Sequence, residues 1–201
     1  MILTPELEIG LRAVSARCFG RAAESLGVLL GRPVRIAVTS VDCLPPEAVA
    51  GLVNLQDGRR LVALQFEFSG EESGFLLIVI PLGAVRQLLR CLIMRQVAPN
   101  PEEFSALETS AVREAGNILA SAFVAELGDL VRRRILPSSP RLKFEGIDEL
   151  VRDLSRTLRR IGPEVVVIRA HFDDPEGDIE GHFLVFPELD SLDRLQSAGE
   201  R

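Results

Sequence analysis

Four polar side chains with helical spacing are the strongest candidates for chemistry in this sequence. Ser110, Glu114 and Asn117 stand at positions i, i+4 and i+7, and Ser121 follows one turn later. In a helix that advances about 100° per residue, the first three lie within about 60° of one another and form one narrow stripe. A carboxylate can form an ion pair with a cation, and a carboxamide can hold a water molecule. We expect the stripe to face solvent, because the opposite side of the helix is apolar.

The rest of the composition excludes several classes of enzyme. The chain has 201 residues but only one lysine, two histidines and three cysteines. They are Lys143, His171, His182, Cys18, Cys43 and Cys91. A phosphate-binding loop needs the lysine of its GK[ST] motif, and a zinc site needs clustered cysteines and histidines. A Ser-His-Asp triad needs a histidine that can reach the nucleophile. The sequence offers none of these patterns, and we expect no metal site.

Charge and hydropathy narrow the class of partner. The formal net charge is −6, so no cationic surface is expected to bind nucleic acid. Three dispersed cysteines without a CxxC motif indicate free thiols in a reducing compartment, so we expect a cytoplasmic protein. We also expect it to be a monomer. The longest uncharged apolar run covers 74–85, which is too short to cross a bilayer, so no membrane insertion is expected.

Cap residues predict two long helices. Thr4 and Pro5 open the first, which is expected to run to about Leu30. Asn100, Pro101 and Glu103 form a capping-box pattern, which predicts a second helix over 101–134. An extended strand is expected at 34–39, and hairpins are expected at 60–68 with 74–81 and at 164–172 with 179–187. Short helices are expected at 82–94 and 147–160.

The two halves of the chain, roughly 1–98 and 99–201, share an order of elements. Each has a long helix, an extended strand, a hairpin that ends in proline, and a short helix. A shift of 101 residues also lays Leu26-Gly27 on Leu127-Gly128. This pattern predicts an internal duplication within one domain over 1–201. The expected fold is α+β, with a pseudo-two-fold, a six-stranded and mainly antiparallel sheet, and the two long helices packed on one face.

The stripe and a later proline together resemble a family signature. Ser110, Glu114 and Asn117, followed after 22 intervening residues by Pro140, are similar to the motif of the CheC, CheX and FliY phosphatases of bacterial and archaeal chemotaxis. The context is most similar to CheC, and the resemblance extends over nearly the whole chain, including Leu30–Val34 in the first half.

The resemblance implies a function for each of these residues. It implies hydrolysis of the aspartyl phosphate of CheY or a CheY-like receiver, with Mg²⁺ supplied by that partner and no cofactor of the protein's own. Asn117 would orient the attacking water, and Glu114 would pair with a lysine of the receiver. Ser110 and Ser121 would contact the partner or support the stripe. Pro140 would lie outside the chemistry and shape the chain beside the helix.

The first long helix lacks the signature. The 101-residue shift places Ile9, Ala13, Ala16 and Thr39 opposite the four motif positions. CheC proteins commonly have two sites, and this chain is expected to have one. The first helix would then serve packing or the docking of a partner such as the receptor deamidase CheD.

Other readings of the same residues stay open. A Ser/Glu/Asn stripe taken alone is usually a solvated helix face. Within the family, the alternative to an enzyme is a non-enzymatic, CheC-like adaptor that binds CheD or a receiver domain. A third reading assigns the substrate to another two-component pathway.

Overall fold

One antiparallel sheet runs through the protein, and the computed structural model describes residues 3–52, 60–93 and 104–199. Its strands are β1 (Arg35–Leu44), β2 (Leu61–Gly70), β3 (Gly74–Pro81), β4 (Ile135–Pro137), β5 (Arg141–Glu145), β6 (Val165–Asp173) and β7 (Glu180–Pro187). They lie in the order β1-β6-β7-β3-β2-β4, and β5 also pairs with β2. The predicted α+β class and both predicted hairpins are confirmed, although β4 and β5 make the sheet seven-stranded instead of six-stranded.

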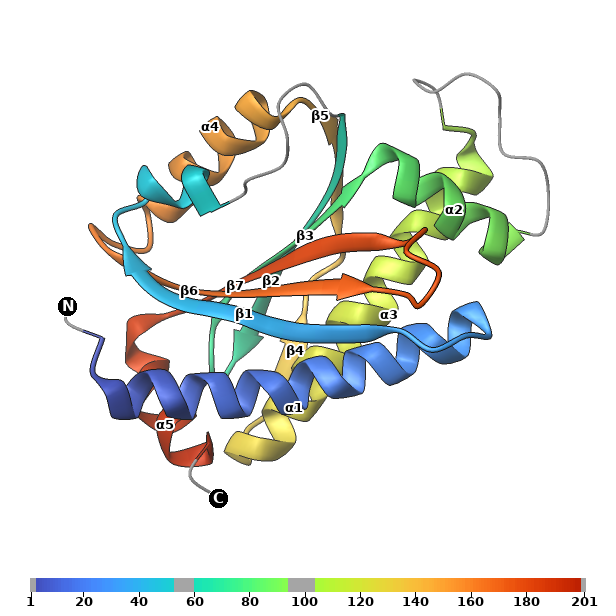
Figure 1. Ribbon diagram of the computed structural model, residues 1–201. Helices are drawn as coiled ribbons and strands as arrows, with labels where there is room; N and C mark the ends of the chain where they lie inside the picture. The colour runs from blue at the N-terminus through green and yellow to red at the C-terminus, as the bar shows by residue number, and fades with distance from the viewer. Residues whose placement is uncertain (1–2, 53–59, 94–103, 200–201) are drawn as a thin grey trace.

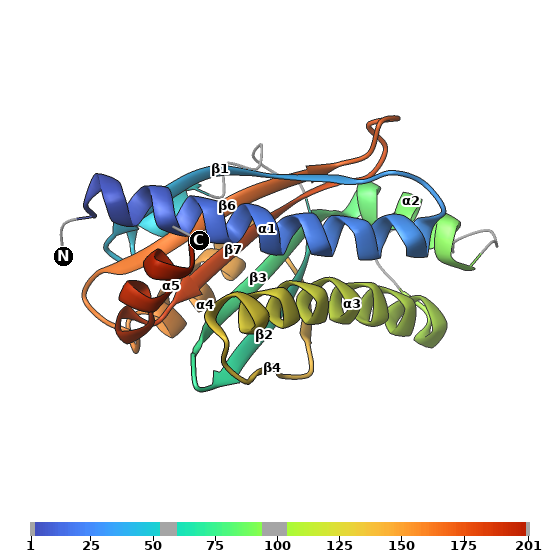
Figure 2. The ribbon, with the colours of Figure 1, turned by 90° about the horizontal axis from the view of Figure 1, so that it is seen from below.

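The long helices α1 (Pro5–Leu30) and α3 (Ala106–Val131) lie side by side on one face of the sheet and run in opposite directions (Figures 1 and 2). The remaining helices are η1 (Ala48–Leu52), α2 (Leu82–Ile93), α4 (Ile147–Leu158), η2 (Leu189–Ser191) and α5 (Leu192–Gly199). Figure 1 shows α4 on the other side of the sheet, where its leucines join a second apolar cluster with β6 and β7. Both faces of the sheet are therefore covered, but only one by long helices.

The second long helix begins and ends inside the range that the sequence predicted, so the expected bounds of 101–134 are wrong. Its N-cap is Ser105, whose hydroxyl accepts the Glu108 N–H at 3.2 Å, while the Glu108 carboxylate accepts the Ser105 N–H at 2.7 Å. This capping box satisfies two helix-end amides at once and fixes the start. The cap residues expected from sequence, Asn100, Pro101 and Glu103, lie outside the described residues.

The two long helices match each other in length and in both ends. Each has 26 residues, and their first residues, Pro5 and Ala106, stand 101 positions apart. Each ends at a residue in the left-handed region, Gly31 with φ 67° and Arg132 with φ 56°. The same shift that aligned the sequence halves therefore aligns the helix ends. Their origin by duplication, and the division near residue 98, stay predictions.

The two halves exchange strands. β1 from the first half pairs with β6, and β4 and β5 from the second half pair with β2. The two hairpins meet at the centre, where β3 pairs with β7. Neither half can complete its sheet alone, which explains why the chain forms one unit with a shared core.

A glycine lets α3 lie close to the sheet. A Cβ atom added at Gly116 would stand 2.8 Å from Cδ2 of Leu64, a fully buried residue of β2. Real Cβ contacts are longer than this, so a side chain at position 116 would push α3 outward or displace Leu64. Gly20 on α1 is different, because an added Cβ there meets no atom within 4 Å.

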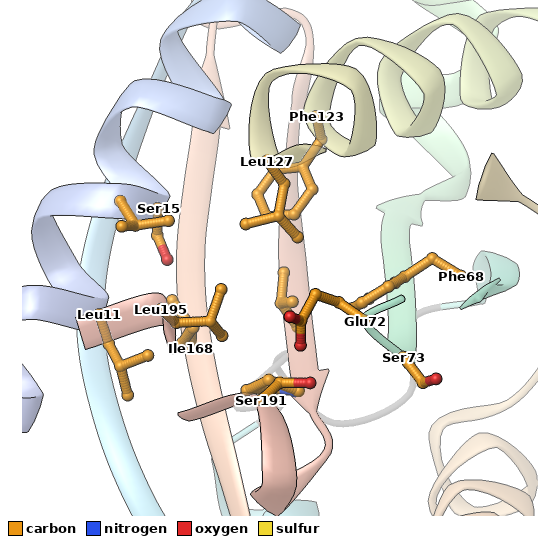
Figure 3. Close-up of a pocket in the computed structure, with 13 residues that line it drawn as sticks. Leu11, Ser15, Phe68, Glu72, Ser73, Phe123, Leu127, Ile168, Ser191 and Leu195 are labelled. Atoms are coloured by element: carbon orange, nitrogen blue, oxygen red, sulfur yellow. The ribbon is translucent and has the colours of Figure 1, made fainter. Parts of the chain in front are cut away.

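The sequence analysis did not predict α5, which is tied to the sheet by an ion pair between a half-exposed arginine and a buried glutamate. The Glu72 side chain, on the turn between β2 and β3, is 1% exposed and accepts hydrogen bonds from Nε and Nη2 of Arg194, the second at 2.9 Å. Burial alone would raise the pKa of Glu72, but hydrogen bonds from Arg194 and Ser191 outweigh it and lower the pKa. Figure 3 shows Glu72 and Ser191 beside a small, mostly apolar cavity of about 10 Å³ under α1 and α3.

Replacing Gly116 should separate α3 from the sheet. We expect Gly116→Val to lower the free energy of unfolding by about 1–3 kcal/mol, as overpacked cores do. Gly20→Ala should instead raise it by up to about 1 kcal/mol, because alanine favours a helix and has room there. Urea denaturation measures both. Equal stability of Gly116→Val and wild type would contradict the close contact with Leu64.

The Glu72 ion pair should make the protein sensitive to acid. A carboxyl group whose pKa is lowered by folding stabilises the protein above its unfolded pKa, and that stabilisation is lost as the pH falls through the folded value. We expect Glu72→Gln to lower the free energy of unfolding at neutral pH by about 1–3 kcal/mol, and to flatten its decline below about pH 4. Chemical denaturation across pH measures this. Glu67→Gln, at an exposed glutamate of β2, is the control and should change little.

Candidate functional site

The four predicted stripe residues lie on the outer face of α3, away from the sheet. Ser110 and Glu114 are exposed, and Asn117 and Ser121 are half-buried. The opposite face is buried in the core between α1, α3 and the sheet; its apolar residues are Val112, Ala115, Leu119, Ala120, Phe123, Val124 and Leu127. Burial of this face fixes the rotation of the helix and thereby presents the stripe to solvent.

The two long helices hold each other in this orientation. The rings of Phe19 on α1 and Phe123 on α3 stack obliquely with centroids 4.8 Å apart, and Phe19 also contacts Phe183 of β7 at 5.2 Å. An ion pair between Arg17 and Glu126, 3.7 Å long, joins the helices nearer the surface. Asn117 therefore lies on a helix that packs against the sheet on its inner face and against α1 on one flank.

The functional groups of the stripe are available to another molecule. Ser110 donates its hydroxyl hydrogen to the carbonyl of Ala106 at 2.8 Å, which leaves its oxygen lone pairs free to accept. Among the residues that the structure describes, Glu114 and Asn117 have no ion pair or side-chain hydrogen bond. An exposed carboxylate and an amide one turn apart, both without a partner, can bind a cation and a water molecule together.

The matching face of α1 offers no such groups. Ile9 occupies the place of Ser110 and is 68% exposed, while Ala13 is half-buried and Ala16 is exposed. The backbone geometry of the site is thus repeated on α1, but its side chains can neither form an ion pair nor hold a water molecule.

Pro140 is not part of the stripe. It belongs to the link 138–140 between β4 and β5, where three residues stand opposite two of β2. Its counterpart by the 101-residue shift, Thr39, is the extra residue where the β1–β6 register shifts between Val38 and Ser40. Both positions therefore interrupt an edge strand, so the structure brings Ser110, Glu114, Asn117 and Ser121 together and leaves Pro140 at the sheet edge.

Other residues with metal or nucleophile chemistry are used structurally. The lysine, Lys143, pairs with Asp153 and joins β5 to α4. Cys18 is fully buried, and burial raises the pKa of its thiol, so it is a poor nucleophile. His171 and His182 face each other on β6 and β7 with ring centroids 5.0 Å apart. Within the described residues there is no group of three or more metal-ligating side chains, and no helix is long and apolar enough to span a membrane.

Two residues near the stripe were missed by the sequence analysis. Gly116 sets the distance between α3 and the sheet, and Arg113 stands one turn before Asn117. The signal for Arg113 was present in the sequence, because the 101-residue shift lays it on Arg12.

Comparisons with known proteins agree with the fold and the motif, although no protein-family profile matches the chain. The chain is 23% identical over 193 residues to the CheY-P phosphatase CheC of Bacillus subtilis, covering 92% of this chain and 90% of that protein. The crystal structure of Thermotoga maritima FliY superposes with a TM-score of 0.75 at 20% identity, covering 100% and 98% of the two chains. A FliM–SpeE complex from H. pylori contains a chain with a TM-score of 0.67 at 12% identity, with coverage of 98% and 96%. The chain is therefore similar to CheC along about nine-tenths of its length, and it shares the fold of the FliY and CheX structures.

Proposed function

We propose that the protein hydrolyses the aspartyl phosphate of CheY or a CheY-like receiver domain in the cytoplasm. The observation that carries this proposal is the pair Glu114 and Asn117 on one face of α3. Glu114 is exposed, Asn117 is half-buried, and neither side chain has a hydrogen bond or ion pair among the described residues. The name of the B. subtilis relative, a CheY-P phosphatase, supports the same reaction.

The reaction needs little from the catalyst beyond orientation. The oxygen of a water molecule forms a bond to phosphorus, the bond from phosphorus to the aspartyl oxygen breaks, and the electron pair leaves with the carboxylate. Both water protons end on the released phosphate. The carboxamide oxygen of Asn117 accepts a hydrogen bond from that water and holds its oxygen in line with the breaking bond. Mg²⁺ belongs to the receiver and neutralises charge on the phosphoryl oxygens there.

Glu114 positions the helix on the receiver. Its carboxylate is one turn from Asn117 and is directed to solvent, so it can pair with a lysine at the receiver's active site. Such a pair is stronger than a solvated one, because docking removes water from both groups. Ser110 and Ser121 extend the contact along the helix. Pro140 takes no part in the chemistry.

A second function is supported by a different observation. The chain has an α1 face on which Ile9 is exposed and all the motif residues are replaced, and a related fold occurs in a FliM–SpeE complex. The alternative is therefore a non-enzymatic adaptor that binds a receiver or CheD. Catalytic amounts of protein added to a phosphorylated receiver separate the two functions, because an adaptor binds in stoichiometric amounts without releasing phosphate.

Removing the amide that would hold the water should greatly slow turnover. We expect Asn117→Ala to lower kcat by on the order of 10²-fold, with little change in the thermal unfolding midpoint, because the Asn117 side chain has no hydrogen bond or ion pair among the described residues. Phosphate release from a phosphorylated CheY-like receiver with Mg²⁺ measures this. Wild-type turnover in the variant would sink the proposed mechanism.

Removing the anchoring carboxylate should weaken docking. We expect Glu114→Ala to raise KM for the phosphorylated receiver about tenfold, which corresponds to about 1.4 kcal/mol, with a smaller change in kcat. The control is Asp129→Ala, which removes an exposed acid of the same helix about four turns away. Equal effects of the two substitutions would mean that general charge, and not a specific ion pair, governs docking.

A further inference from the structure

An arginine that the family signature does not include lies beside the water-holding amide. Arg113 is exposed and stands four residues before Asn117 on α3. Side chains at i and i+4 of a helix are neighbours, with Cβ atoms about 5–6 Å apart. Arg113 and Asn117 are therefore neighbours on the outer surface of α3.

The two long helices differ in the ion pairing of this arginine. Arg12, its counterpart on α1, donates to the Glu8 carboxylate at 3.3 Å and is close to the carbonyl of Val38 at 3.5 Å. On α3 the position of Glu8 is taken by Thr109, which has no charge. Among the described residues Arg113 has no ion pair. The arginine beside the absent site is thus neutralised, and the one beside the candidate site is left available.

We propose that Arg113 is a further catalytic residue, whose guanidinium donates hydrogen bonds to the phosphoryl oxygens of the receiver's aspartyl phosphate. This inference rests on the proposed phosphatase function. The phosphoryl group keeps its negative charge while its bond to the aspartyl oxygen breaks and the bond to water forms. A planar, permanently charged guanidinium with several donors matches that group and stabilises the charge as the bond breaks.

The placement favours the phosphoryl group over the receiver's surface. Glu114, the docking residue, is the next residue in sequence, and successive side chains of a helix point about 100° apart. Arg113 is therefore on the side of the stripe that includes Asn117, where the attacking water would be held. A cation at this place acts on the reacting group, whereas the anion at Glu114 acts on the docked partner.

The test compares steady-state hydrolysis of a phosphorylated CheY-like receiver by wild type and by three variants at two positions. We expect Arg113→Ala to lower kcat about 10- to 100-fold with KM within threefold of wild type, and Arg113→Lys to recover part of the loss. Arg12→Ala, the matched control, should leave both constants unchanged. Thermal unfolding should be unaltered in all three, since the side chains are at least partly exposed.

A second variant tests the availability of Arg113 without removing it. Thr109→Glu places a carboxylate one turn before Arg113, as Glu8 stands before Arg12, and should lower kcat severalfold by pairing with the guanidinium. Thr109→Gln should leave kcat unchanged. Combined with Arg113→Ala, Thr109→Glu should add no further loss, because both changes remove the same interaction.

The outcomes separate this inference from the function on which it rests. If wild type releases phosphate and the Arg113 variants match it, or if they raise KM alone, Arg113 does not act on the phosphoryl group and the inference is wrong. If wild type gives no release above that of the receiver alone, the phosphatase function fails and the inference fails with it. A fall in kcat that Thr109→Glu reproduces and Thr109→Gln does not would support it.

Discussion

The contact between α1 and α3 over one face of the sheet is the constraint from which the rest of the structure follows. Each helix buries one apolar side, and the rings of Phe19 and Phe123 meet between the two helices. The inner side of each helix packs on the sheet and one flank packs on the other helix. One outer face of each helix therefore remains for solvent. On α3 that face includes Glu114 and Asn117, whereas on α1 it includes Ala13 and Ala16. The same packing therefore produces one candidate site and one face without chemistry.

A site of this kind is compatible with a sequence that contains few of the usual catalytic side chains. In the proposed reaction the acyl phosphate is already activated and its metal ion would belong to the receiver, so a general base would not be required. What the protein must supply is a firmly held position for an amide and a carboxylate. Gly116 contributes to that position by letting the helix approach Leu64, which places a packing residue among those on which the proposed reaction would depend.

Much of the fold followed from local signals in the sequence. The hairpins were predicted from alternating apolar residues with polar turns, and the stripe was predicted from helical spacing. The start of α3 was not, because two capping patterns compete there and the Ser105–Glu108 box determines the start. The helix α5 was also missed, since its position depends on Glu72, more than a hundred residues earlier. The 101-residue shift aligns Arg113 with Arg12 in the sequence, but the difference in their ion pairs is visible only in the structure.

The strand exchange between the halves has a consequence for how the chain folds. β1 cannot pair until β6 has been made. In this ladder Arg35 of β1 pairs with Asp173 of β6, which lies 138 residues later in the chain. During synthesis the hairpin of β2 and β3 has no neighbour on either side until the second half has emerged. Such long-range pairing slows folding and leaves strand edges open for a time. The arrangement that joins the two halves most firmly is therefore also the one that delays their assembly until β6 and β7 have been made.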